Sequence, residues 1–106
     1  MEIIKQGTTP SFICEFDPET ALVTDIQQAV LSITNDEKVT HHMLNELTVN
    51  SLANVVSYQF SQEETLAFKA NTNVTMELHI LMNDKRSCVA EVKAVVRKSQ
   101  YDEVLE

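Results

Sequence analysis

The sequence has no tryptophan, one glycine, two prolines and two cysteines among its 106 residues. Two cysteines are too few for a disulfide framework, so an apolar core has to hold the fold. Gly7, Pro10 and Pro18 all lie near the start, so Asn, Asp, Ser and Thr have to make the later turns. No stretch approaches the roughly 18 apolar residues of a membrane span. Residues 1–6 lack the apolar segment of a signal peptide.

Basic residues are also scarce. Eight Lys and Arg face 16 Asp and Glu, for a formal net charge of −8 at pH 7. This charge repels nucleic-acid phosphates, and Lys85-Arg86 and Arg97-Lys98 are too short to form a basic patch. We expect synthesis in the cytoplasm, no nucleic-acid or membrane partner, and either self-association into a homo-oligomer or binding to another protein with a basic face.

The hydrophobic fraction of 43% is ordinary for a globular protein. The length suits one domain, and no repeat, linker or low-complexity segment divides the chain. We therefore predict a single domain over residues 1–106.

The second half of the chain alternates between apolar and polar residues. One face of residues 74–82 carries Val74, Met76, Leu78, Ile80 and Met82, and one face of residues 88–96 carries Cys88, Ala90, Val92, Ala94 and Val96. Period-two patterns on both sides of a polar turn predict a long antiparallel hairpin with one buried face.

The charges predict the register of this hairpin. A three-residue loop would set Glu77 against Glu91, and like charges directly opposite each other destabilise a sheet. A five-residue loop, with Met82 opposite Cys88, places Glu77 against Lys93 instead. The turn has no glycine for a tight two-residue loop. We therefore predict the longer loop.

Further strands are predicted at residues 12–16 and 56–60, where apolar and polar residues again alternate. Ser61 and Glu64 have the spacing of a capping box, which predicts a short helical turn near residues 61–68. Residues 21–52 fit either helical spacing or two strands, and the local pattern leaves both open. The strand interpretation gives an all-β antiparallel sandwich of about seven strands. An outer edge of strands 74–82 or 86–97 is the predicted docking surface.

The histidines do not have the spacing of a metal site. His41 and His42 are adjacent, so on a strand they point to opposite faces. His79 has no cysteine or acidic residue at ligand spacing in the sequence. We interpret all three as surface residues and expect no metal or other cofactor.

The cysteines and carboxylates indicate no catalysis. Cys14 and Cys88 lie at inward positions of their predicted strands, where thiols behave as small hydrophobes. Without a secretion signal we expect them to be free thiols and not a disulfide. Glu63 and Glu64 are accounted for by the helix cap. We expect no catalytic or cofactor-binding residues, and no enzyme activity.

Three segments resemble a family of small prophage-encoded proteins. They are residues 6–12 (QGTTPSF), residues 60–68 (FSQEETLAF) and the long strand pair that follows. The family's Asp- and Gly-rich hairpin turn is here NDKR. These proteins are similar to the immunoglobulin-like N-terminal domain of phage baseplate upper proteins. The resemblance implies an immunoglobulin-like sandwich, a strand over residues 25–34, a role in the phage tail or virion, and no catalytic residues.

Three functions fit these expectations to different degrees. A non-catalytic structural or protein-interaction module of a phage tail or baseplate agrees with all of them. An adhesive or carbohydrate-binding sandwich is the alternative, but it should expose aromatic rings, and the chain has four Phe and two Tyr. A small enzyme would need a pocket that a compact core of this size does not spare.

Overall fold

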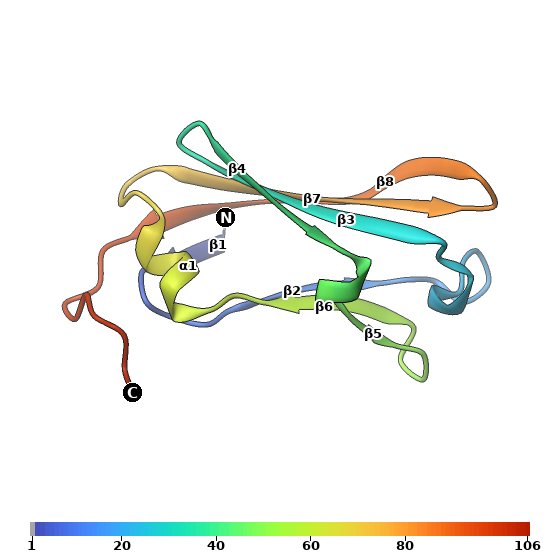
Figure 1. Ribbon diagram of the computed structural model, residues 1–106, viewed down its shortest axis with the longest axis horizontal. Coiled ribbons are helices and arrows are strands. Elements are labelled where there is room, and N and C mark those ends of the chain that lie inside the picture. Colours follow the sequence, from blue (N-terminus) through green and yellow to red (C-terminus); the bar gives the residue numbers. More distant parts are fainter. Residues whose placement is uncertain (1) are drawn as a thin grey trace.

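The computed structural model describes residues 2–106 as two packed sheets (Figure 1). The elements in chain order are β1 (Glu2–Lys5), β2 (Ser11–Glu15), η1 (Val23–Asp25), β3 (Gln28–Asn35), β4 (Lys38–Met43), η2 (Leu44–Glu46), β5 (Thr48–Asn50), β6 (Val55–Gln59), α1 (Gln62–Ala67), β7 (Asn73–Met82) and β8 (Lys85–Arg97). One sheet has the order β1-β8-β7-β3-β4 and the other β2-β6-β5. The predicted immunoglobulin-like all-β sandwich is confirmed, with eight strands in place of about seven. It is not wholly antiparallel as predicted, because β1 pairs with β8 in parallel.

The ambiguous region is built from strands. β3 and β4 form an antiparallel hairpin, and the helical content there is limited to the 3₁₀ turns η1 and η2. The strand that the family resemblance places at residues 25–34 runs from Gln28 to Asn35, because Asp25 belongs to η1. The helical spacing of this segment was misleading, because backbone pairing with β4 on one side and β7 on the other holds it as a strand.

The inner faces of the two sheets enclose the core. In β3 and β7, buried residues alternate with partly exposed or exposed ones, as period-two burial requires. The buried apolar residues are Ile4, Phe12, Cys14, Val23, Ala29, Leu31, Ile33, Val56, Phe60, Val74, Met76, Leu78, Ile80, Ala94 and Val96. The helix α1 begins after Ser61, whose hydroxyl accepts from the Glu64 amide, so the predicted capping box is confirmed.

Tight turns form without glycine. Asn83 and Asp84 both have positive φ values, 54° and 58°, and join Met82 to the opposite residue Lys85 as a two-residue turn. The predicted five-residue loop is therefore wrong. Asn and Asp reach the left-handed region at modest cost. The Asp84 amide and carboxylate are also both hydrogen-bonded to the Gln27 side chain, at 2.8 and 3.0 Å.

A β-bulge reconciles this turn with the alternating pattern. A two-residue turn alone would set inward residues of β7 against outward residues of β8. Leu78 pairs with Ala90 while His79 pairs with Cys88, so Val89 is the extra residue. Beyond the bulge, Glu77 faces Glu91 and Lys93 faces Thr75. The predicted Glu77–Lys93 pair is therefore wrong.

The turn and the bulge also decide where Cys88 lies. Cys14 is buried in β2, as predicted, but Cys88 is exposed, and both thiols are free. Cys88 lies on the turn side of the bulge. There the even-numbered residues of β8 point outward, whereas beyond the bulge the odd-numbered residues do. The predicted burial of Cys88 is therefore wrong.

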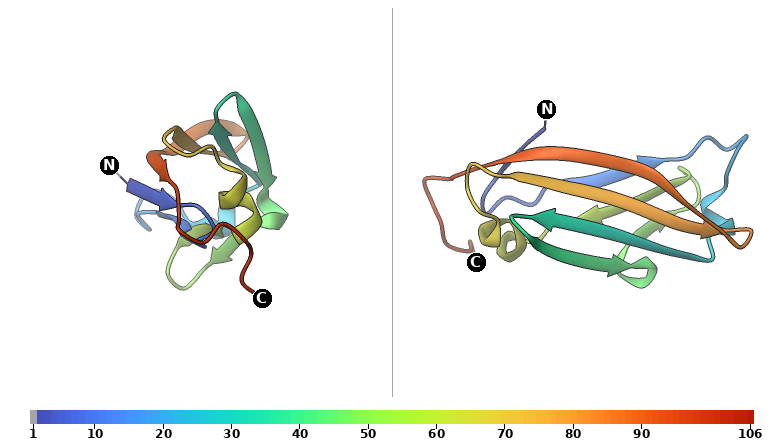
Figure 2. Two further views of the ribbon diagram at one scale, coloured as in Figure 1. Left: turned by 90° about the vertical axis from the view of Figure 1, so that its left-hand side faces the viewer. Right: turned by 90° about the horizontal axis from the view of Figure 1, so that it is seen from above.

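The strand edges differ from the expectation. β7 lies between β8 and β3, so it has no free edge. β8 pairs with β1 only over Ala94–Arg97, and residues 85–93 have no outer neighbour within the described chain. The predicted docking edge at residues 74–82 is therefore wrong. The predicted edge at residues 86–97 is open over residues 86–93. Views from the end and from above show β1 and β8 at one side of the sandwich and β4 at the other (Figure 2).

Candidate functional site

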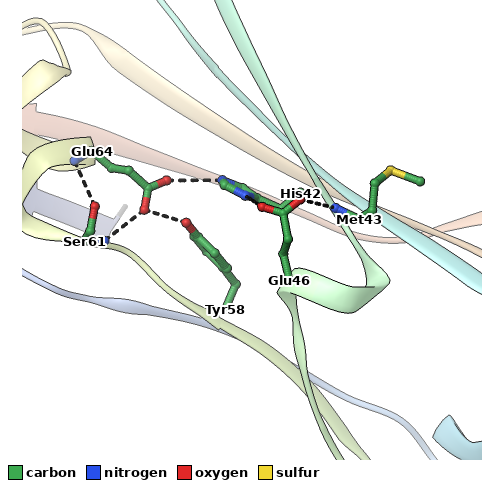
Figure 3. A network of polar contacts seen from close by, with 6 residues as sticks. All are labelled: His42, Met43, Glu46, Tyr58, Ser61 and Glu64. Atoms are coloured by element: carbon green, nitrogen blue, oxygen red, sulfur yellow. Dashed lines mark hydrogen bonds and ion pairs between the residues drawn. The ribbon is translucent and has the colours of Figure 1, made fainter.

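The most connected polar cluster lies between the two sheets, around His42 (Figure 3). His42 lies on β4 opposite Leu31, so its ring faces the second sheet and its side chain is only 12% exposed. Nδ1 lies 3.0 Å from a Glu46 carboxylate oxygen, and Nε2 lies 3.2 Å from a Glu64 carboxylate oxygen. The imidazole therefore bridges η2 and α1.

Tyr58 completes the cluster from β6. Its ring stacks on the His42 ring at a centroid distance of 4.2 Å, and its hydroxyl donates to Glu64. The same carboxylate oxygen of Glu64 accepts from the Ser61 amide at 2.9 Å. Figure 3 shows Glu64 between Ser61, Tyr58 and His42. One carboxylate thus ties the helix cap to both sheets.

The cluster changes the acidity of its members. Burial raises the pKa of Glu64, but the hydrogen bonds from Tyr58 and Ser61 and the interaction with His42 outweigh it, and the net pKa is lowered. The hydrogen bond from His42 lowers the pKa of Glu46. Burial and the bond to Glu64 raise the pKa of the Tyr58 phenol. The cluster therefore favours charged carboxylates and a neutral phenol.

These groups connect β4, η2, β6 and α1 through their hydrogen bonds. Both ring nitrogens of His42 and both oxygens of Glu64 have protein partners. The sequence pattern predicts Glu64 in the helix cap and His42 at the surface. The histidine assignment is corrected here, because strand alternation turns one of two adjacent histidines inward.

A second cluster lies on the outer face of the larger sheet. One ligand atom each from Glu77, His79 and Cys88 lies within 4.8 Å of the others. Glu77 and His79 are two residues apart on β7, and Cys88 faces His79 from β8. The expectation that His79 has no acidic or cysteine neighbour is therefore wrong. Cross-strand pairing supplies the cysteine, and a correct register was the only signal that could have found it.

The third histidine lies elsewhere on that face. His41 is exposed on β4, and its Nδ1 lies 2.8 Å from the Ser32 hydroxyl of β3. β3 separates β4 from β7 in the sheet. His41 and His79 therefore occupy different strands and do not form a pair.

An apolar hollow of about 260 Å³ lies between β1 and β2. Ile3 and Ile13 line it, and each is 62% exposed. Phe12 and Phe60 lie deeper, and Glu2 is the only charged residue in the lining. Two isoleucines this exposed, on edge strands of the two sheets, form a patch that a protein partner can cover.

Exposed aromatic rings are few. All six aromatic residues are described, and Tyr101 alone is classed as exposed. Phe12 and Phe60 are buried in the core. A platform for stacking on sugar rings is therefore lacking among the aromatic residues of this chain.

No protein-family model and no curated protein sequence matches the chain. Within residues 2–106, no helix has both the length and the apolar character needed to cross a bilayer.

Proposed function

We propose that this chain is a non-catalytic protein-interaction module, and that its setting is the tail or baseplate of a phage particle. The observation that carries the interaction role is the hollow between β1 and β2 with Ile3 and Ile13 at its rim. The phage setting is supported by the resemblance of residues 6–12 and 60–68 to prophage-encoded proteins.

The polar chemistry of the chain supports a non-catalytic role. The His42 cluster has its nitrogens and carboxylate oxygens bonded within the protein. Its bonds join strands of the two sheets and α1. It stabilises the sandwich and leaves the surface to make contacts.

The occupant of the hollow is an aliphatic side chain of a neighbouring protein subunit in the particle. The hollow is apolar, so a large polar side chain would lose hydration there without a hydrogen-bonding partner. Glu2 at its rim and the net charge of −8 favour a partner surface with basic residues around that side chain. Among residues 2–106, β2 pairs with β6 alone, so its other edge is open to the same partner.

Particles from induced cells test this proposal. Wild-type chain and an Ile13→Asp variant would be produced in such cells, and the particles would be separated from free protein on a density gradient. The wild-type chain should be found in the particle fraction at a fixed ratio to the tail proteins. Ile13→Asp should be lost from the particles, because it places a charge in the apolar contact.

Val39→Asp is the matched control. Val39 is 52% exposed on β4, at the opposite side of the sandwich. This variant should enter particles like the wild type. Absence of the wild-type chain from particles, or equal incorporation of Ile13→Asp, would contradict the proposal. Circular dichroism of both variants would show that they are folded.

A further inference from the structure

We propose that Glu77, His79 and Cys88 form a binding site for one zinc ion on the outer face of the larger sheet. The proposal is independent of the β1–β2 hollow. One ligand atom from each residue lies within 4.8 Å of the other two. Ligand atoms around a tetrahedral zinc ion lie roughly 3.5 Å apart, given bonds of about 2.0–2.3 Å. Side-chain rotations have to close the difference when the ion binds, and the Cys88 thiol has to leave the Ala90 carbonyl, which lies 3.6 Å away.

The ligand chemistry selects the ion. A thiolate, an imidazole and a carboxylate together suit zinc, whereas calcium and magnesium prefer oxygen ligands alone. The Cys88 thiol gives its proton to solvent when its sulfur binds the metal. Three protein ligands leave the fourth position of the ion to water.

The two-residue turn and the bulge create this site together. If the inward alternation of residues 90–96 continued unbroken to position 88, Cys88 would point toward the core, away from His79. The turn instead sets Cys88 opposite His79 on the neighbouring strand, the bulge absorbs the extra residue, and Cys88 is exposed. Bulges commonly redirect a side chain at functional positions.

The surrounding charges both favour and oppose a cation. Glu91 lies directly opposite Glu77, so two carboxylates face each other beside the site. A divalent cation would relieve that repulsion. Arg86 opposes it, because its Nε donates to His79 Nδ1 at 3.3 Å.

Arg86 therefore competes with the metal. When Nδ1 accepts from Arg86, the proton of the neutral ring is on Nε2, which lies 3.1 Å from Glu77. Zinc needs a lone pair of the ring. Binding through Nδ1 takes the lone pair that accepts from Arg86, and binding through Nε2 moves the ring proton onto Nδ1, so Arg86 has to leave in either case. Removing Arg86 should then strengthen metal binding.

Equilibrium titration of the full reduced chain tests the site. The metal-free protein would compete for zinc with a chromophoric chelator, and cobalt(II) would serve as a spectroscopic substitute. The wild type should bind one ion, and its cobalt form should show thiolate-to-metal charge-transfer absorption. His79→Gln and Cys88→Ser should each weaken binding by about tenfold or more, since loss of even outer-shell partners costs about 10–100-fold.

Two further variants make the test specific. His41→Gln removes an exposed histidine from the same face and should bind like the wild type. Arg86→Met removes the competing donor and its charge while keeping an apolar side chain, and should bind zinc about tenfold more tightly. All of these positions are partly or fully exposed, so the variants should fold.

Several results would overturn the proposal. They are wild-type affinity no higher than that of Cys88→Ser, a cobalt spectrum without charge-transfer absorption, and equal losses from His41→Gln and His79→Gln. Unchanged affinity in Arg86→Met would overturn the competition between Arg86 and the metal.

Discussion

Glu77 and Glu91 lie directly opposite each other on β7 and β8, although like charges in that position destabilise a sheet. The pair is on the outer face of the sheet, where solvent screens its repulsion. His79 Nε2 also lies 3.1 Å from Glu77 and hydrogen-bonds one of the two carboxylates. The register follows the two-residue turn and the bulge, at the cost of this one unfavourable pair.

Replacing Glu91 with lysine should therefore stabilise the protein. An opposite-charge pair in place of a like-charge pair should raise the free energy of unfolding by about 0.2–1 kcal/mol in urea denaturation. The gain should shrink at high salt, because the groups are exposed. Glu91→Gln should give a smaller gain. A loss of stability in both variants would show that the register differs.

Asn54 should be the most sensitive polar residue of the fold. Its Oδ1 accepts from the Val23 amide, and its Nδ2 donates to the carbonyls of Phe16 and Ala21. The residue is buried and has a φ of 57°. Asn54→Ala should cost about 3 kcal/mol or more in urea denaturation, because buried backbone groups lose their partners. Asn50→Ala, at an exposed loop contact, should cost about 1 kcal/mol or less. Equal costs would contradict this role.

Glu64 should make stability dependent on pH in the acid range. Its pKa is lower in the folded protein than its ordinary value. Its contribution is therefore complete above the ordinary carboxyl range and is lost as pH falls through the folded pKa. Glu64→Gln should lower stability at pH 7 by about 2 kcal/mol and flatten the acid part of the stability curve. The exposed neighbour Glu63, changed to Gln, should leave the curve unchanged. A steep acid loss in Glu64→Gln would contradict this account.

The two thiols should react at different rates. Cys88 is exposed, whereas Cys14 is buried and its burial raises the pKa of its thiol. A thiol reagent should label one cysteine quickly in the native protein and the second only on unfolding. Cys88→Ser should abolish the fast phase. A fast phase that persists in this variant would show that Cys14 is accessible.

The alternating pattern was sufficient to predict the strands at residues 12–16 and 56–60 and the last hairpin, because burial of one sheet face imposes period two on each strand. For residues 21–52 it left helix and strands open. The capping box at Ser61 was likewise a local signal, and it was confirmed. The register of the last hairpin was not predictable from charge pairs. Those pairs contribute less than the turn at Asn83-Asp84 and its contacts with Gln27, a residue far away in the sequence.

The candidate sites depended on the same non-local information. His42 meets Glu64 only because β4 and α1 come together across the sandwich. Cys88 meets His79 only because the two-residue turn sets that register and the bulge accommodates it. Neither contact has a spacing in the sequence that would reveal it. The contact between His42 and Glu46 does have such a spacing, because Glu46 lies four residues after His42.

Hydrogen exchange in the assembled particle tests the proposed interaction role most directly. β2 pairs on one side only, so the amides on its open edge should exchange rapidly in the free chain. When the chain is bound in the particle, residues 2–5 and 11–15 should become protected, while β4 should exchange as in the free protein. Protection confined to β4, or no difference between the free and particle-bound chain, would contradict the proposal that the β1–β2 side binds the partner.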